Sequence, residues 1–177
     1  MEERESPQPG KSLFQGSFLT KRLIMSGGKG GVGKTTCASA IALRFADSGQ
    51  RTLLLSSDPT ASLSDIFECN LGTQLTPIPG VANLWGLELG REQVLGMWRD
   101  RYGAQIYEVL SSFLPVGPEI IDYIAEAPGV VEEQFMLAYI LDLIQGSGFE
   151  KIIWDTAPAG HTPVSYTHLT LPTKRIV

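Results

Sequence analysis

The sequence predicts an α/β fold in which a mostly parallel sheet carries helices on both faces. Four short apolar runs show no alternation of apolar and polar residues, which is typical of strands buried on both faces. Segments with helical periodicity separate these runs, and strands that alternate with helices form right-handed βαβ units. The 177 residues, 43% hydrophobic and 19% charged, are enough for one globular domain.

The first half of the chain predicts three strands and one long helix. The first strand is predicted at Lys21–Gly27 and the second at Arg51–Asp58, where an apolar run ends in an acidic residue. Between them, Gly33–Ser48 carries apolar residues on one helical face, and Gly49 ends the helix. A third strand is predicted at Asn83–Leu89.

The second half predicts three helices and one more strand. Apolar residues recur at helical spacing over Arg91–Leu114, Pro118–Ala127 and Val131–Ile144. The fourth strand, Phe149–Asp155, again ends in an acidic residue. With four candidate strands, we expect an incomplete sheet that leaves one edge open.

Composition narrows the functional classes. Residues 1–20 are polar and rich in proline and glycine, which predicts a flexible leader, and no stretch is apolar enough for a signal peptide or a membrane span. The two cysteines, Cys37 and Cys69, form no CxxC pair, which favours a reduced, cytoplasmic compartment. The net charge of −5 argues against nucleic acid as a partner.

A glycine-rich loop lies between the first predicted strand and helix. It fits the phosphate-binding pattern GxxxxGK[ST], and its place between a strand and a helix is the required context. Lys34 is predicted to reach the β- and γ-phosphates of ATP, and the Thr35 hydroxyl is predicted to bind Mg²⁺. An ordinary glycine-rich turn is the alternative. The predicted ATP-binding residues of the loop are Gly28, Lys29, Gly30, Gly31, Val32, Gly33, Lys34, Thr35 and Thr36.

A second lysine narrows the class of phosphate-binding loop that the sequence matches. In "GKGGVGKT", Lys29 directly follows the first glycine, and the loop resembles the deviant Walker A loop of the class that holds MinD, ParA, the nitrogenase iron protein and the ArsA-type ATPases. In that class the extra lysine reaches phosphate across a dimer interface. The resemblance therefore implies a catalytic role in trans for Lys29 and a homodimer as the active species. The alternative is a solvated loop lysine.

Two further stretches resemble one branch of that class. "SSDPTASLSDIF" and "WDTAPAGHT" are similar to the switch I and switch II segments of the ArsA family and of the related GET/TRC ATPases that guide tail-anchored membrane proteins. "EAPGVVEE" resembles a third segment of the family. The resemblance covers residues 21–162 and implies a P-loop NTPase domain there, with a helical insertion at about 91–127 between the switch segments.

The family resemblance assigns roles to the acidic residues. Asp58 would orient the attacking water, Asp155 would hold the Mg²⁺ shell as the Walker B acid, and the Gly160 N–H would approach the γ-phosphate. The alternative is that a carboxylate at a strand end merely caps the next helix, an explanation that suits Asp65 better and leaves it a supporting role. The family's switch I histidine is replaced by Ala61. We therefore do not expect this chain to relay a signal through that position as the family would.

Hydrolysis in this family implies a conformational switch that drives transport or targeting of a membrane-protein client. The pump branch, whose partner is a membrane pump subunit, binds arsenite or antimonite through cysteines, and no cysteine follows Cys69. The targeting branch shields an apolar client helix, and candidate groove residues are Met97, Trp98, Tyr102, Phe113 and Leu114. The alternative is that this stripe is core. A ParA/MinD-like positioning ATPase and a nucleotide-binding module without turnover remain further alternatives.

The family resemblance stops at Thr162. Residues 163–177 mix β-branched and polar residues without a face to bury, and Pro163 breaks any helix that would follow switch II. We therefore expect residues 163–177 to be a non-native tail.

Overall fold

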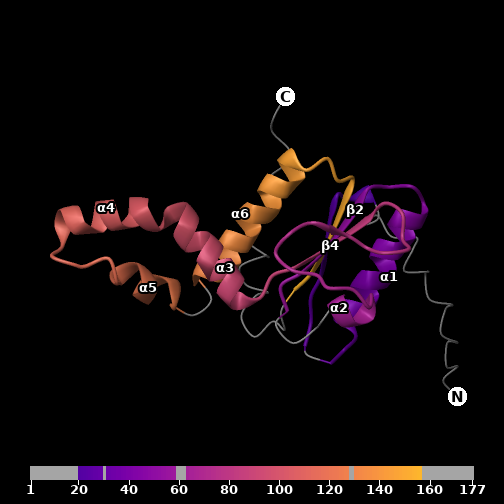
Figure 1. Cartoon of the computed structure of the whole chain (residues 1–177), viewed down its shortest axis with the longest axis horizontal. Helices are drawn as coiled ribbons and strands as arrows, with labels where there is room; N and C mark the ends of the chain where they lie inside the picture. The colour runs from indigo at the N-terminus through magenta and orange to yellow at the C-terminus, as the bar shows by residue number, and fades with distance from the viewer. Residues whose placement is uncertain (1–19, 30, 59–62, 128–129, 157–177) are drawn as a thin grey trace, which may run out of the picture.

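A computed structural model describes residues 20–29, 31–58, 63–127 and 130–156 (Figure 1). A five-stranded sheet with the order β1-β5-β2-β4-β3 forms its centre. The predicted fold class, a mostly parallel sheet with helices on both faces, is confirmed. The strands are β1 (Leu23–Ser26), β2 (Thr52–Ser56), β3 (Thr76–Pro77), β4 (Leu84–Glu88) and β5 (Lys151–Asp155).

The last strand of the described residues lies inside the sheet. β5 pairs in parallel with β1 on one side and β2 on the other, and β2 pairs in parallel with β4. The prediction of four strands was short by one, because β3 adds an antiparallel pair of residues at the edge beside β4. Two residues, one of them a proline, are too few to produce a recognisable strand pattern.

Helices cover both faces of this sheet. The first half of the chain contributes α1 (Lys34–Asp47), which matches the predicted helix, and the four-residue α2 (Leu63–Ile66), which was not predicted. The second half contributes α3 (Arg91–Trp98), the π-helical turn η3 (Arg99–Gly103), α4 (Ala104–Phe113), α5 (Ile120–Ala125) and α6 (Val130–Gly146).

The uninterrupted apolar runs have a direct structural cause. Leu54 and Ile153 pack with α1 on one face, whereas Leu53, Leu55 and Ile152 pack with α3 and α6 on the other. All five are fully buried, because neighbouring residues of a strand point to opposite faces and both faces are covered. Two apolar cores thus hold the sheet rigid from either side.

The predicted helix Arg91–Leu114 is wrong as a single helix, because η3 interrupts it. The interruption also divides its apolar stripe. Trp98, at the end of α3, is buried in the core, whereas α4 has no buried residue and Phe113 is 81% exposed. α4 and α5 project from the sheet as an arm (Figure 1). Of the candidate groove residues, therefore, Trp98 is core, and Phe113 and Leu114 are exposed.

Several predictions lie outside the described residues. These concern the leader at 1–19, Gly30, Ala61, Gly160 and the tail at 163–177. Within the described ranges, no helix is both long and apolar enough to cross a membrane.

Gly86 provides a test of how tightly the sheet is packed at β4. A Cβ at Gly86 would lie 2.7 Å from Leu71 Cδ1 and 2.9 Å from Ile78 Cδ1. Leu71 and Ile78 both belong to the core beside α1. We expect Gly86→Ala to lower the free energy of unfolding by about 1–3 kcal/mol, since overpacking strains a filled core. Urea unfolding followed by circular dichroism measures this.

Gly96→Ala in α3 is the matched control, because a Cβ there meets nothing within 4 Å. It should leave stability unchanged or raise it by up to about 1 kcal/mol, since alanine favours the helix. Equal stability of the two variants would show that the packing around Gly86 yields without cost.

Candidate nucleotide site

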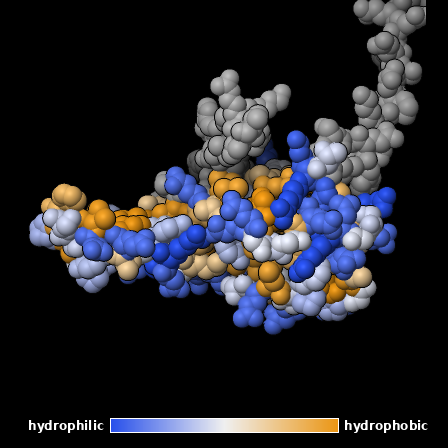
Figure 2. All heavy atoms as spheres, turned by 90° about the horizontal axis from the view of Figure 1, so that it is seen from above, coloured by the Kyte–Doolittle hydropathy of each residue, from blue (hydrophilic) through white to orange (hydrophobic). Residues whose placement is uncertain are grey.

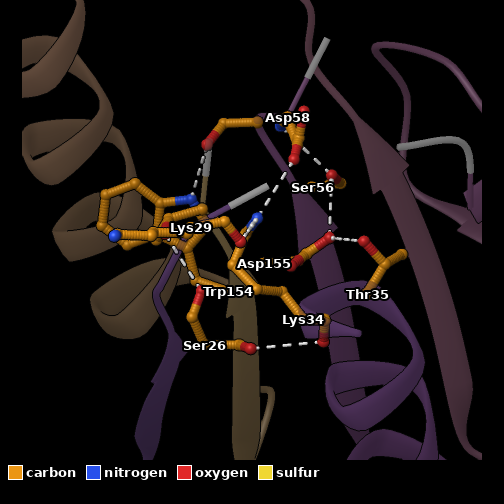
Figure 3. A network of polar contacts seen from close by, with 10 residues as sticks. Ser26, Lys29, Lys34, Thr35, Ser56, Asp58, Trp154 and Asp155 are labelled. Carbon is orange, nitrogen blue, oxygen red and sulfur yellow. Dashed lines mark hydrogen bonds and ion pairs between the residues drawn. The ribbon is translucent and has the colours of Figure 1, made fainter. Parts of the chain in front are cut away.

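The carboxyl ends of three parallel strands meet at one edge of the sheet. Asp155 at the end of β5 lies opposite Ser26 of β1 and opposite Ser56 of β2 in the strand register. Asp58 follows β2 by two residues, because the strand ends earlier than predicted. The two acidic residues that the sequence placed at strand ends are thereby brought to one site (Figure 3).

The glycine-rich loop connects β1 to α1 above this edge. Gly31 has φ 76° and Gly33, the residue before α1, has φ 84° and ψ 25°, a left-handed conformation that side chains disfavour. The hydroxyl of Ser26 donates to the carbonyl oxygen of Lys34 at 3.2 Å, which fixes the start of α1 to the end of β1. The loop therefore presents the N-terminus of a 14-residue helix, with its free N–H groups, at the edge of the sheet.

Lys34 is turned into the site and paired there. Its Nζ lies 3.6 Å from Asp58 Oδ2, and the two side chains are only 5% and 4% exposed. The same Nζ donates to the carbonyl oxygen of Lys29 at 3.4 Å. The lysine and the aspartate that the sequence singled out for phosphate and water are thus direct neighbours.

Thr35 and Asp155 are joined by a short hydrogen bond. The Thr35 hydroxyl donates to Asp155 Oδ2 at 2.7 Å, and the Ser56 hydroxyl donates to the same oxygen at 3.4 Å. The other oxygen, Oδ1, is buried and has no hydrogen-bond partner among the described residues. A buried carboxylate oxygen beside a threonine hydroxyl suits a hard cation such as Mg²⁺, which takes oxygen ligands and keeps several waters.

The surroundings of Asp155 act on its charge in both directions. Burial raises the pKa of Asp155 above its ordinary value, and the negative charge of Asp58 adds to the rise. The hydrogen bond from Thr35 and the positive charge of Lys34 oppose it. A bound divalent cation would favour the ionised carboxylate much more strongly than these groups do.

Comparison with known sequences identifies the family. A sequence model described as anion-transporting ATPase, the ArsA ATPase model, matches residues 21–173, which is well over half of the chain. This chain belongs to the ArsA ATPase family. The resemblance inferred from the loop and the two switch-like stretches is confirmed.

Curated relatives of this ArsA-family chain carry related names. It is 35% identical over 143 residues to "ATPase ASNA1 homolog 1" of Paramecium tetraurelia, covering 81% of this chain and 42% of that protein. It is 35% identical over 166 residues to "ATPase GET3B" of Arabidopsis thaliana, covering 82% and 39%. For "ATPase GET3" of Pyricularia oryzae the identity is 34% over 146 residues, covering 80% and 41%. The chain thus spans about two-fifths of the length of these relatives.

Three further predicted loop residues of the ArsA-family chain, Lys29, Val32 and Thr36, are exposed. Lys29, Val32 and Thr36 line the outer side of the loop and the first turn of α1, and Lys29 contributes its carbonyl oxygen to Lys34. The exposed Lys29 side chain is therefore placed to reach outward and not into the Lys34–Asp58 pair. Asp65 lies on α2 as an exposed residue of its first turn.

Sequence reasoning missed the polar residues that connect this site. Besides Ser26 and Ser56, these are Ser57, whose hydroxyl accepts a hydrogen bond from Trp154 Nε1 at 2.9 Å, and Thr156, whose hydroxyl donates to the Ser26 carbonyl oxygen at 3.0 Å. The available signal was the pair of serines directly before Asp58, since two hydroxyls that end an apolar run need partners.

Proposed function

We propose that this ArsA-family chain is the nucleotide-binding part of an ATPase that couples ATP hydrolysis to the handling of an apolar membrane-protein client. The observation that carries the proposal is the cluster of Lys34, Thr35, Asp58 and Asp155 at one edge of the sheet, where an ion pair joins Lys34 to Asp58 and a hydrogen bond joins Thr35 to Asp155. These are the groups that phosphoryl transfer to water requires: a cation for phosphate, ligands for Mg²⁺ and a base to position water.

Each group has a role that its position supports. Lys34 and the loop N–H groups bind the β- and γ-phosphates, and the N-terminus of α1 adds positive potential. Thr35 and Asp155 hold Mg²⁺, which when bound neutralises charge on the phosphate oxygens. Asp58, two residues beyond β2, accepts a hydrogen bond from the attacking water and orients it.

A homodimer completes the site in this proposal. The side chain of Lys29 is exposed on the loop, so that it can reach a phosphate bound to a second copy of the chain. Hydrolysis would then change the relation between the two copies, as nucleotide switches do when the γ-phosphate is lost.

The arm formed by α4 and α5 supports the choice of an apolar client. Val109, Phe113 and Leu114 on α4 and the linker after it are 58%, 81% and 52% exposed, and Tyr123 of α5 is 80% exposed. Figure 2 shows apolar side chains as a strip along the arm at the left of the view, beside a band of hydrophilic ones. An exposed apolar strip of this kind suits an apolar helix. The GET3 and ASNA1 names of the relatives point to the same branch.

Anion transport is the second candidate, because the family description names it. A soft metalloid such as arsenite is bound by thiolates, and the sequence offers Cys37 and Cys69 alone. Cys37 is exposed on α1, and the described residues contain no group of three cysteine, histidine or acidic residues that could hold a metal ion. The site therefore supports a client helix better than a metalloid.

ATP turnover tests the enzymatic part of the proposal. We expect Asp58→Asn to keep ATP binding and to lower phosphate release by about 100-fold, since only the step that orients water is lost. Phosphate release is measured with excess ATP and Mg²⁺, on this chain and on the complete protein. Asp47→Asn, which removes an exposed acid at the end of α1, is the control and should release phosphate normally. Normal turnover by Asp58→Asn would remove Asp58 from the mechanism.

The client surface has its own test. We expect Phe113→Ser to weaken binding of an apolar helical peptide by about tenfold, because burying a phenylalanine contributes roughly 1.5–3 kcal/mol. Fluorescence anisotropy of a labelled peptide measures the affinity. Glu108→Ser, an exposed polar position on the same helix, should bind the peptide as the parent chain does. Equal peptide affinity of all three proteins would exclude the arm as the client surface.

A further inference from the structure

The Lys34–Asp58 ion pair joins the residue proposed to bind phosphate to the residue proposed to orient water. Lys34 Nζ lies 3.6 Å from Asp58 Oδ2 and also donates to the Lys29 carbonyl oxygen at 3.4 Å. Figure 3 shows the ammonium between this carbonyl group and the carboxylate. Because both side chains are almost fully buried, the pair is shielded from solvent ions and holds its geometry.

A phosphate on the loop would need this same ammonium. A phosphoryl group carries negative charge, and a carboxylate held in an ion pair with the same cation would repel it. A buried lysine, in turn, cannot remain without a counter-charge at low cost. Phosphate binding and the Lys34–Asp58 contact therefore compete for one positive charge.

We propose that Asp58 holds the place of the phosphate on Lys34. Its carboxylate is the counter-ion of the loop lysine until a phosphoryl group of the nucleotide replaces it, and this replacement releases Asp58 to orient water. The inference rests on the proposed function and adds a regulatory step to it. One exchange of partners makes the water-orienting aspartate available only when the phosphate that it serves is bound.

The backbone around Asp58 allows the side chain to change partner while its position in the fold is kept. The Asp58 N–H donates to the Ser56 hydroxyl at 3.3 Å, and that hydroxyl donates to Asp155 Oδ2 at 3.4 Å. Ser56 is fully buried at the end of β2. The main chain of Asp58 thus stays tied to the predicted Mg²⁺ ligand, so that rotation of the side chain is enough to exchange Lys34 for water.

The exchange has a measurable consequence for affinity. A ligand that must displace an internal competitor binds more weakly than one that meets a free group. A neutral residue at position 58 should therefore tighten binding of phosphate ligands, even though the same change lowers turnover in the proposed mechanism. If Asp58 did nothing except orient water, its replacement would leave this affinity unchanged.

Inorganic pyrophosphate without Mg²⁺ is the probe, since it offers phosphoryl groups to the loop and carries neither a base nor a metal. Isothermal titration of this chain should give a dissociation constant roughly fivefold or more lower for Asp58→Asn and Asp58→Ala than for the parent. Asp58→Glu keeps the charge and should show no such gain. Asp47→Asn, which removes an exposed charge, should bind as the parent does, and the gain should persist at high salt because a buried pair is screened little.

The outcomes separate this inference from the proposed function. If both neutral variants bind pyrophosphate as tightly as the parent or more weakly, the exchange of partners is overturned and the ATPase proposal stands. Equal gains in Asp58→Glu and Asp58→Asn would also overturn it, because charge would then not be the cause. No pyrophosphate binding by any of the proteins would instead contradict the phosphate site itself.

Discussion

Replacing Lys34 with methionine should remove nucleotide binding and destabilise the chain in the absence of nucleotide. The loss of ADP affinity is expected to be about 100-fold or more, roughly 2.8 kcal/mol, because the phosphates lose their principal cation. Isothermal titration with ADP measures it. Lys29→Met removes a lysine from the same loop whose side chain is exposed, so its ADP affinity in the monomer should be close to that of the parent.

The effect of Lys34→Met on stability follows from its buried partner. With Lys34 removed, the Asp58 carboxylate loses its ammonium while remaining almost fully buried, and breaking one side of a buried pair costs about 3–5 kcal/mol. The double variant Lys34→Met/Asp58→Asn removes both charges and should be more stable than Lys34→Met alone. Urea unfolding of the four proteins forms a double-mutant cycle. A coupling energy near zero would show that the two side chains do not stabilise each other.

Replacing Asp155 with asparagine should change binding and stability in opposite directions. Asparagine can still accept the hydrogen bond from Thr35, but it offers no charge to Mg²⁺. We expect the increase in ADP affinity that Mg²⁺ gives the parent chain to fall by about tenfold or more, roughly 1.4 kcal/mol. Titrations with and without Mg²⁺ measure the difference.

The same Asp155→Asn variant should be the more stable protein without metal. In the parent, burial opposes the ionised carboxylate and Oδ1 has no partner among the described residues, which costs about 1–3 kcal/mol for a buried polar atom. A neutral amide reduces this cost. Thermal unfolding in the presence of a chelator is the measurement. A less stable variant would mean that Oδ1 is satisfied in solution and that the site is not built around a cation.

Much of the fold was predictable because its signals are local. Continuous apolar runs predicted β1, β2, β4 and β5, and the loop spacing predicted where α1 begins. Elements no longer than about one period, such as the four-residue α2 and the two-residue β3, carry no such signal. The π-helical turn was also invisible, since Arg99–Gly103 continues the apolar spacing of the helices on either side.

The site was predictable only as a set of residues and not as a network. Lys34, Thr35 and the two acidic residues are recognisable from spacing and strand ends. The contact of Ser56 with Asp155 depends on the register of β2 against β5, residues that are separated by 99 positions in the chain. No local pattern specifies that register, because it is set by how the whole sheet packs between its two layers of helices.

The place of β5 in the sheet has a consequence for synthesis on the ribosome. β1 and β2 are not neighbours, and β5, which joins them, is made after the other four described strands, when more than a hundred further residues have left the ribosome following β1. At about 5–20 residues per second, the facing edges of β1 and β2 lack their partner strand for several seconds before β5 arrives. Such long-range pairing also slows folding. The loop and Lys34 can fold early, but Thr35 gains its acidic partner only when translation has passed Asp155.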